Sequence, residues 1–469
     1  MSPTLLLKNA LVIATMDDEQ REIANGSVFI RGNRVEAVGP ASELPATADK
    51  VIDMTGHVLI PGLINTHHHM FQSLTRALPA AQDAELFDWL TALFPVWQNI
   101  TPAMQRAATR TAMAELMLSG CTTAADHAYL YVNGTRLDDS VQAAQEMGMR
   151  FHAVRGAMSL GQSQGGLPPD ALVEQDEDAI LKEMQRVVEE LHDATPDAMI
   201  KVALGPCSPF TVTTDLMREG AALARSCGVG LHTHTAENAK DLAFSKERYG
   251  MTPTEYTESV GWVGHDVWHA HCVHLDDPGI ALFARTGTGV AHCPCSNMRL
   301  ASGIAPIRKM RDAGVKVGLG VDGSASNDTN NLLDEARQAM LSARVRDENP
   351  TAMSAREALY MPSVAWAYPA PPAGQRQTVP AAPVIPAEAA RKYRYGLTGD
   401  SPPWRPISVF DDGRRIYVVF PRGIGQGEMP PIFVIGSDGE TQIVNSRIHQ
   451  NILIVDRLFG AAELRLGSG

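Results

Sequence analysis

The chain has 469 residues, of which 44% are apolar, and a formal net charge of −13. A chain of this size can bury a large core, and its acidic balance argues against nucleic acid or an anionic membrane surface as the main partner. It contains no 18-residue apolar stretch and its N-terminus lacks the features of a secretory leader, so we expect a cytoplasmic protein with no membrane insertion.

The first 56 residues predict a small β segment. Runs such as "LLLKNALVIAT" and "GSVFIRGNRVEAVG" alternate apolar and polar residues between turns, as short strands do. Short strands need partners in a sheet to be stable. We therefore expect residues 1–56 to form an accessory β segment that precedes the main domain.

From about residue 57, short apolar runs alternate with amphipathic helical stretches. This alternation is typical of parallel strands joined by crossover helices. The eight apolar runs are "HVLIPGLINT", "CTTAADH", "MRFHAVRGAM", "MIKVALGPCS", "VGLHTHTAE", "VWHAHCVHL", "TGVAHCPCSN" and "KVGLGVDGS". The helical stretches include Thr101 to Ser119, Asp176 to His192, Thr214 to Cys227 and Ile304 to Ala313. Eight such units predict an α/β fold, a (β/α)8 TIM barrel, over residues 57–359.

A doubly wound open sheet is the competing architecture for this region. It would require a glycine-rich phosphate turn after its first strand, and "NTHHHMFQ" has none. Polar residues capable of chemistry instead follow the ends of the predicted strands, where TIM barrels carry their sites. These residues are His67, His69, Asp126, His127, Cys207, Ser208, His234, Glu237, His271, Asn297 and Asp322.

The histidine run at residues 67–69 predicts part of a metal site. Alternate residues of a strand share a face, so His67 and His69 project together while His68 points away. His234 ends the fifth apolar run, and Asp322 follows the eighth in a glycine-flanked segment. Three histidines and one aspartate suit one Zn²⁺ ion, with Fe²⁺ as the alternative, and leave a coordination position open for water.

Such a site predicts hydrolysis of a C–N bond. A bound divalent ion lowers the pKa of its water and so supplies hydroxide as the nucleophile. Glu237 follows His234 closely enough to accept a proton and deliver it to the leaving nitrogen. His271 could polarise the heteroatom that gains charge, and Asp322 could accept the proton of the water. Taken singly, Glu237 could also be an acid that begins a helix, and His271 a core histidine.

Other zinc hydrolase patterns are absent from the chain. It has no HExxH, and the PCxxC of small zinc deaminases is missing because "HCPCSN" spaces its cysteines as CxC. Cys293 and Cys295 are therefore expected to be core or pocket residues. No elbow motif supports a serine triad.

Five ordered motifs carry a family resemblance. "PGLINTHHH", "HTHTAEN", "HCVHL", "HCPCSNMRLASG" and "GLGVDGSASND" together resemble the amidohydrolase superfamily over residues 3–359, in the branch of cyclic amidine deaminases and chlorohydrolases. That resemblance implies metal ligands and catalytic residues at the positions already singled out. The implied ligands are His67, His69, His234 and Asp322, and the implied catalytic residues are Glu237, His271 and Asp322.

The resemblance also bears on the number of metal ions. Members with two metals place a carbamylated lysine at the end of the fourth strand. Here that strand ends in "LGPCSPF" and Lys201 stands at its start, so one metal ion is expected.

The same resemblance suggests the substrate. Gln72 stands where guanine deaminases use an amide to bind a purine edge, and Cys207 stands where related members have Arg or His. "FQSLTRALP" together with "PCSPF" is most similar to 8-oxoguanine deaminases. We therefore expect a small-molecule, purine-like substrate, 8-oxoguanine or guanine, with a pterin or triazine ring as the alternative. A homo-oligomer is an open alternative to a monomer.

The C-terminal part has a different character. Residues 360–390 are rich in proline and predict a linker, and residues 391–469 show strands separated by Asp-Gly turns, which predict an all-β sandwich. "SPPWRPISVFDDGRRIYVVFP" and "PPIFVIGSDGETQIVNSR" resemble TrbG-type conjugal transfer proteins. The resemblance implies type IV secretion partners, and thus a channel component as the alternative function.

The two resemblances conflict at their junction. Amidohydrolases complete their N-terminal strands with further strands after the barrel, and from Leu359 onward those strands are replaced in this chain. We therefore expect exposed strand edges around residues 4–56 and a less stable protein.

Overall fold

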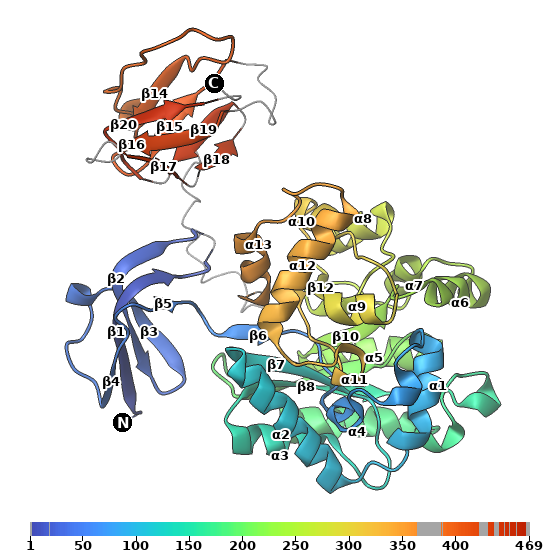
Figure 1. The fold of residues 1–469 in the computed structure, drawn as a ribbon. Coiled ribbons are helices and arrows are strands. Elements are labelled where there is room, and N and C mark those ends of the chain that lie inside the picture. The colour runs from blue at the N-terminus through green and yellow to red at the C-terminus, as the bar shows by residue number, and fades with distance from the viewer. Residues whose placement is uncertain are drawn as a thin grey trace. The chain divides into compact units, whose positions relative to one another are not determined.

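The computed structural model describes residues 2–17, 19–363, 386, 388–421, 430–435, 440–444, 446–449, 451–455 and 457–465. The chain separates into two compact units, residues 1–370 and 371–469 (Figure 1). The finer boundaries predicted at residues 56, 359 and 390 stay predictions.

The larger unit contains a closed barrel of eight parallel strands, as predicted (Figure 1). Each of the eight apolar runs contributes one strand. The strands are β6 (Leu63–Asn65), β7 (Cys121–Ala128), β8 (Arg150–Ala157), β9 (Ile200–Pro206), β10 (Gly230–Thr235), β11 (Val267–His271), β12 (Gly289–His292) and β13 (Val317–Leu319). The barrel closes where Leu319 pairs with Asn65. The end of the seventh run differs from the prediction, because "PCSN" begins a short helix at Pro294.

Helices surround this barrel (Figure 1). They are α1 (Leu86–Trp97), α2 (Pro102–Leu118), α3 (Leu137–Met147), α4 (Glu177–Leu191), α5 (Thr214–Cys227), α6 (Ala239–Tyr249), α7 (Pro253–Ser259), α8 (Asp277–Thr286), α9 (Pro294–Arg299), α10 (Ile307–Asp312), α11 (Ser324–Asn327), α12 (Leu332–Arg346) and α13 (Ala355–Tyr360). No helix in the described parts of the chain is both long enough and apolar enough to cross a membrane.

Side-chain caps explain why the predicted helix ends lie close to the observed ones. The hydroxyl of Thr101 accepts a hydrogen bond from the first turn of α2, and Asp176 and Thr213 do the same for α4 and α5. Gly228 ends α5 in the left-handed conformation, with φ 69°. The largest difference is in α10, which begins at Ile307, after Pro306, rather than at residue 304.

The hydrophobic core lies between strands and helices, while the barrel interior is filled differently. A small cluster inside the barrel contains Trp268 with Ala125, Val154, Ala203 and Ala291. Four small side chains around one tryptophan leave space for rings that project inward from the strand ends, and the buried histidines described below occupy it.

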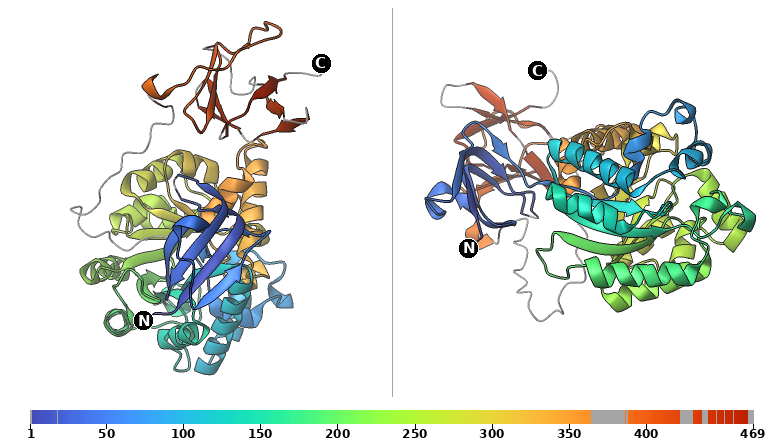
Figure 2. Two further views of the ribbon diagram at one scale, coloured as in Figure 1. Left: turned by 90° about the vertical axis from the view of Figure 1, so that its left-hand side faces the viewer. Right: turned by 90° about the horizontal axis from the view of Figure 1, so that it is seen from below.

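The N-terminal residues form a separate sheet beside the barrel (Figure 2). Its strands are β1 (Thr4–Ala14), β2 (Glu22–Arg31), β3 (Arg34–Pro40), β4 (Lys50–Asp53) and β5 (Val58–Leu59). The order is β3-β2-β1-β4, and β5 also pairs with β1. An ion pair of 3.0 Å between Arg34 and Asp197 links the sheet to the barrel.

The predicted strand edges are present in this sheet. β3 and β4 are its outer strands, and each is paired on one side only among the described residues. Val35 in β3 is 62% exposed and Val51 in β4 is 47% exposed. Apolar side chains on open edges are a feature that most proteins avoid, because such edges can pair with other chains.

The smaller unit contains two antiparallel sheets (Figure 1). Its strands are β14 (Ser408–Asp411), β15 (Ile416–Val419), β16 (Ile432–Ile435), β17 (Thr441–Ile443), β18 (Ser446–His449), β19 (Ile452–Val455) and β20 (Ala461–Leu464). One sheet has the order β14-β15-β19-β18 and the other β17-β16-β20. Side chains of both share one core, in which Ile416 and Leu453 of the first sheet join Ile432 of the second. The predicted sandwich is therefore present.

Most of the predicted linker, residues 364–385, lies outside the described residues. Its first residues are helical, because α13 runs to Tyr360 and a turn of 3-10 helix covers Met361–Ser363. Met361 is buried in the barrel core.

Candidate metal centre and active site

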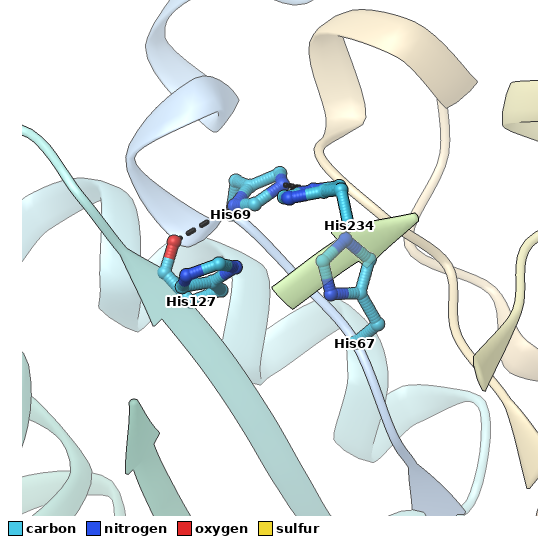
Figure 3. A group of neighbouring side chains, drawn as sticks. All are labelled: His67, His69, His127 and His234. Carbon is cyan, nitrogen blue, oxygen red and sulfur yellow. Dashed lines mark hydrogen bonds between the residues drawn. The ribbon is translucent and has the colours of Figure 1, made fainter. Parts of the chain in front are cut away.

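All four predicted metal ligands lie at one mouth of the barrel. His67 and His69 follow β6, His234 lies in β10 and Asp322 follows β13. The carboxyl ends of parallel barrel strands lie at the same end, which brings together side chains that are far apart in sequence. Figure 3 shows the rings of His67, His69 and His234 gathered there with that of His127.

Their polar atoms converge. Nε2 of His69 lies 3.1 Å from Nε2 of His234 and 3.4 Å from Oδ1 of Asp322. Nε2 of His67 lies 3.3 Å from the same oxygen. His68 projects elsewhere, as predicted, and belongs to neither of the two buried groups whose spacing suits a metal ion.

The hydrogen bonds of the ring nitrogens determine which atoms can bind a metal. Nδ1 of His69 lies 2.8 Å from the carbonyl oxygen of His127, and Nδ1 of His234 lies 2.5 Å from that of Cys207. A carbonyl oxygen only accepts, so both rings carry their proton on Nδ1. Burial, with neighbouring histidines, lowers the pKa of both rings well below the ordinary value and keeps them neutral. Their Nε2 lone pairs are therefore available to a metal ion.

Two further observations indicate that the site fits a cation. Nε2 of His67 is buried and has no hydrogen-bond partner, which is costly for a polar atom unless a ligand satisfies it. Asp322 supplies the negative charge. Burial alone would raise the pKa of Asp322, but its contact with His67 and the charge of His271 hold that pKa well below its usual range.

The carboxylate of Asp322 is held by its surroundings. The hydroxyls of Ser296 and Ser326 donate to Oδ2 over 2.6 and 3.2 Å, and the backbone N–H of Gly323 donates to Oδ1 over 2.7 Å. Asp322 has φ 61°, a conformation that L residues rarely adopt. Backbone strain of this kind persists where the surrounding structure enforces it, often at functional sites.

Glu237 and His271 lie next to this cluster. Nε2 of His271 is 3.6 Å from Glu237 Oε2 and 3.8 Å from Asp322 Oδ2. Nδ1 of His271 donates to the side-chain oxygen of Asn297 over 2.9 Å, which directs Nε2 at the two carboxylates. His271 also has a left-handed backbone, with φ 67°.

The pKa values of these two groups are raised for different reasons. Burial raises the pKa of Glu237 to about 7, although His271 opposes the change. Burial alone would lower the pKa of His271, but the charges of Glu237 and Asp322 raise it overall. A carboxyl group that titrates near neutrality can both accept and donate a proton at working pH.

A pocket opens over these groups. Its floor contains Glu237, His271 and Asp322, and its far wall is formed by apolar side chains of α1, including Trp89 and Phe94. An apolar lining with a few polar groups is typical of pockets that bind small molecules.

Both predicted substrate-binding residues line this pocket. Oε1 of Gln72 is buried without a hydrogen-bond partner, and Nε2 of Gln72 lies 3.4 Å from the hydroxyl of Tyr129. A side chain at Gly323 would place its Cβ 1.8 Å from Gln72 Oε1, so Gln72 could not keep its position. Cys207 also lines the pocket. Its carbonyl oxygen accepts the hydrogen bond from Nδ1 of His234. Burial raises the pKa of the Cys207 thiol, which keeps it protonated.

Several residues that support the site are not among those predicted from the sequence. His232 contacts His67, and Ser296 and Ser326 hold Asp322. The alternation in "HTHTAEN" places His232 on the same strand face as His234, a signal that could have identified it. His127 was noted only as a strand-end residue. No comparable pattern marks the two serines, because they lie in the short helices α9 and α11, whose contacts with Asp322 depend on the tertiary structure.

Two family profiles and several known proteins match the sequence of this chain. The profile of the "Amidohydrolase family" matches residues 58–365, and that of a "Conjugal transfer protein" matches residues 339–469. The chain is 44% identical to 8-oxoguanine deaminase of Pseudomonas aeruginosa, over 72% of this chain and 76% of the relative. It is 38% identical to an isoxanthopterin deaminase from an unknown prokaryotic organism, over 73% of each chain.

A solved structure matches both in fold and in sequence. It is an atrazine chlorohydrolase from Arthrobacter aurescens TC1 complexed with zinc, with a TM-score of 0.73 and 34% identity, and the match covers 76% of this chain and 81% of that one.

Proposed function

Because this chain belongs to the amidohydrolase family, we propose that it is a metal-dependent hydrolytic deaminase of a purine-like base, 8-oxoguanine or guanine. The observation that carries the proposal is that Nε2 of His69 lies within 3.4 Å of both His234 Nε2 and Asp322 Oδ1, and that these residues line one pocket together with Glu237. Its relatives include deaminases, which act on C–N bonds.

We assign one divalent ion to His67, His69, His234 and Asp322, with zinc as the first choice and iron as the alternative. Three neutral imidazole nitrogens and one carboxylate are a ligand set that zinc prefers. When bound, such an ion activates a water molecule for attack at neutral pH. A single site is proposed because a second metal ion would need a lysine at the carboxyl end of β9. Lys201 stands at the beginning of that strand.

Glu237 is the proposed proton carrier. Its carboxylate lies at the pocket floor, and its pKa of about 7 allows it to take a proton from the attacking water and give it to the leaving nitrogen. His271 stabilises the ring atom that gains negative charge, because its Nε2 faces the pocket from a position held by Asn297. Asp322 accepts the second proton of that water when the C–N bond breaks, and this proton passes to the ring nitrogen that gained charge.

The pocket supports a flat bicyclic base as substrate. Trp89 and Phe94 offer apolar surface to the faces of an aromatic ring, while the unpaired amide oxygen of Gln72 can bind an N–H group on its edge. Cys207 borders the same space. A pterin or a triazine is the alternative, since relatives that act on those rings are also similar to this chain.

Ammonia release from 8-oxoguanine by the zinc-loaded full chain tests this proposal. Guanine, isoxanthopterin and an amino-triazine complete the substrate panel, and His234→Ala and chelated enzyme serve as negative controls. Release that requires His234 and metal supports a deaminase, and the preferred substrate decides among the three ring classes. A zinc-loaded enzyme that releases no ammonia from any of them contradicts the proposal.

A second candidate function rests on the C-terminal unit. The conjugal transfer profile matches residues 339–469, and the two sheets there share a core of their own. We propose that this unit binds the outer-membrane lipoprotein of a type IV secretion channel. The full chain should bind such a lipoprotein in solution, and a chain that ends at residue 370 should not. Equal binding by both chains, or by neither, contradicts this proposal.

A further inference from the structure

The three imidazoles of the metal site are held in two different ways. The Nδ1–H groups of His69 and His234 donate to backbone carbonyl oxygens, which no side-chain substitution removes. Nδ1 of His67 instead lies 2.7 Å from Nε2 of another side chain, that of His232. The orientation of His67 therefore depends on the identity of residue 232.

The direction of the hydrogen bond between these two rings follows from the next contact. Nδ1 of His232 lies 2.8 Å from the carbonyl oxygen of Trp268, so this nitrogen must donate. A proton on Nε2 as well would make His232 a buried cation whose two N–H groups face a carbonyl and another imidazole. The neutral ring carries a lone pair on Nε2 and accepts the Nδ1–H of His67. The lone pair of His67 Nε2 is then left free, 3.3 Å from Asp322 Oδ1.

His232 is held rigidly in this role. Its side chain is fully buried, and its ring stacks on that of Trp268 with centroids 4.6 Å apart and an interplanar angle of 20°. The indole N–H of Trp268 donates over 3.1 Å to the carbonyl oxygen of Thr66, the residue before His67. Trp268 thus contacts both the acceptor ring and the backbone that carries the metal ligand.

We infer that His232 is a positioning residue of the metal centre, which accepts the Nδ1–H of His67 and so keeps the Nε2 lone pair of His67 directed at the ion. The inference rests on the metal site of the proposed function. Groups that hold the second nitrogen of a ligating histidine fix its tautomer and its ring orientation, and their loss weakens metal binding.

Three variants separate this role from simple packing. His232→Phe keeps a ring that can stack on Trp268 but removes both nitrogens. His232→Gln restores an oxygen that can accept from His67. The matched control is His269→Phe on the adjacent strand β11. His269 is also fully buried, and its nitrogens contact Thr235 and Trp262 rather than a metal ligand.

Zinc affinity, measured by competition with a chelator, is the main readout. We expect about 10- to 100-fold weaker binding for His232→Phe. His232→Gln should recover most of that loss, and His269→Phe should bind zinc as the wild type does even if it unfolds at a lower temperature. Unchanged affinity in folded His232→Phe, or an equal loss in His269→Phe, would overturn the inference.

Neutron diffraction from wild-type crystals provides a test that needs no variant. The inference requires a deuteron on Nδ1 of His67 and none on Nε2 of His232, and the opposite placement contradicts it. The outcome is separable from that of the proposed function. A wild type that binds zinc but deaminates nothing refutes the function alone, tight zinc binding by His232→Phe refutes the inference alone, and a wild type that binds no metal refutes both.

Discussion

At the scale of single residues, the site depends on a carboxyl group kept in an unfavourable environment. Glu237 is buried, and its ordinary pKa of 4.5 is raised to about 7 in the folded protein. Between those two pH values the unfolded chain loses its proton while the folded chain keeps it, so the free energy of unfolding falls as the pH rises. The penalty is complete above about pH 7 and is on the order of 3 kcal/mol.

Glu237→Gln should therefore separate stability from activity. Glutamine is always neutral, so the metal-free variant should unfold at a higher temperature than the metal-free wild type at pH 8, and at the same temperature at pH 4. The zinc-loaded variant should lose about 10²- to 10⁴-fold in kcat. Thermal unfolding by circular dichroism and an ammonia assay measure the two effects.

Glu335→Gln is the control for this comparison. Burial also raises the pKa of Glu335 to about 7, but Glu335 does not line the pocket. The Glu335→Gln variant should also unfold at a higher temperature than the wild type at pH 8 and at the same temperature at pH 4. Its loss of activity should be far smaller. A Glu237 variant that is no more stable at pH 8 than the wild type would contradict the electrostatic argument.

The serine hydroxyls on Asp322 lead to a second prediction at this scale. Ser296→Ala removes the 2.6 Å hydrogen bond to Oδ2, and we expect about 10-fold weaker zinc binding. Ser302→Ala is matched to it, because the Ser302 hydroxyl is buried but has no hydrogen-bond partner. Zinc content after dialysis against a weak chelator should fall in the first variant only. An equal fall in both would show that the hydroxyl on Asp322 has no special role.

At the scale of elements, α1 contributes apolar lining to the pocket. Leu86, Trp89, Leu90 and Phe94 of this helix all line the pocket. The salt bridge of 3.0 Å between Glu85 and Lys240 links the start of the helix to α6, although both side chains are largely exposed and such pairs contribute little. Apolar packing is therefore the main determinant of the position of α1.

Leu90→Ala tests the contribution of α1 to substrate binding. Removal of the side chain opens apolar space next to the ring, and we expect KM to rise about 5- to 30-fold with kcat nearly unchanged, since 1–2 kcal/mol of uniform binding is lost. Val96→Ala lies on the same helix but outside the pocket and should leave KM unchanged. Steady-state kinetics on the preferred base distinguish the two. A change confined to kcat in Leu90→Ala would contradict this role.

At the scale of the whole molecule, the accessory sheet has open strand edges. Its outer strands β3 and β4 carry exposed apolar residues, and Val35 on β3 is 62% exposed. Open, apolar strand edges favour association with other chains.

A charge on that edge should reduce aggregation. Val35→Lys is expected to raise the temperature at which light scattering increases, without a change in activity, because lysine on an edge strand opposes pairing. Val345→Lys adds the same charge at a helix position that is 71% exposed. If both variants resist aggregation equally, the strand edge is not responsible.

The sequence by itself determined the barrel, the sandwich and most of the site. Strand and helix periods are local, and glycines and caps mark helix ends, so all eight barrel strands could be predicted from the apolar runs. The histidines, Glu237 and Asp322 stand at strand ends, which a barrel brings to one mouth.

Only the tertiary structure decided what surrounds those residues. The bond from His67 to His232, the hydroxyls of Ser296 and Ser326 on Asp322, and the wall that α1 forms over the pocket all join segments distant in sequence. Spacing along one strand shows which side chains share a face, but not which loop folds over that face. The orientation of a ring or a carboxylate depends on partners from other segments, and those become neighbours only when the barrel closes.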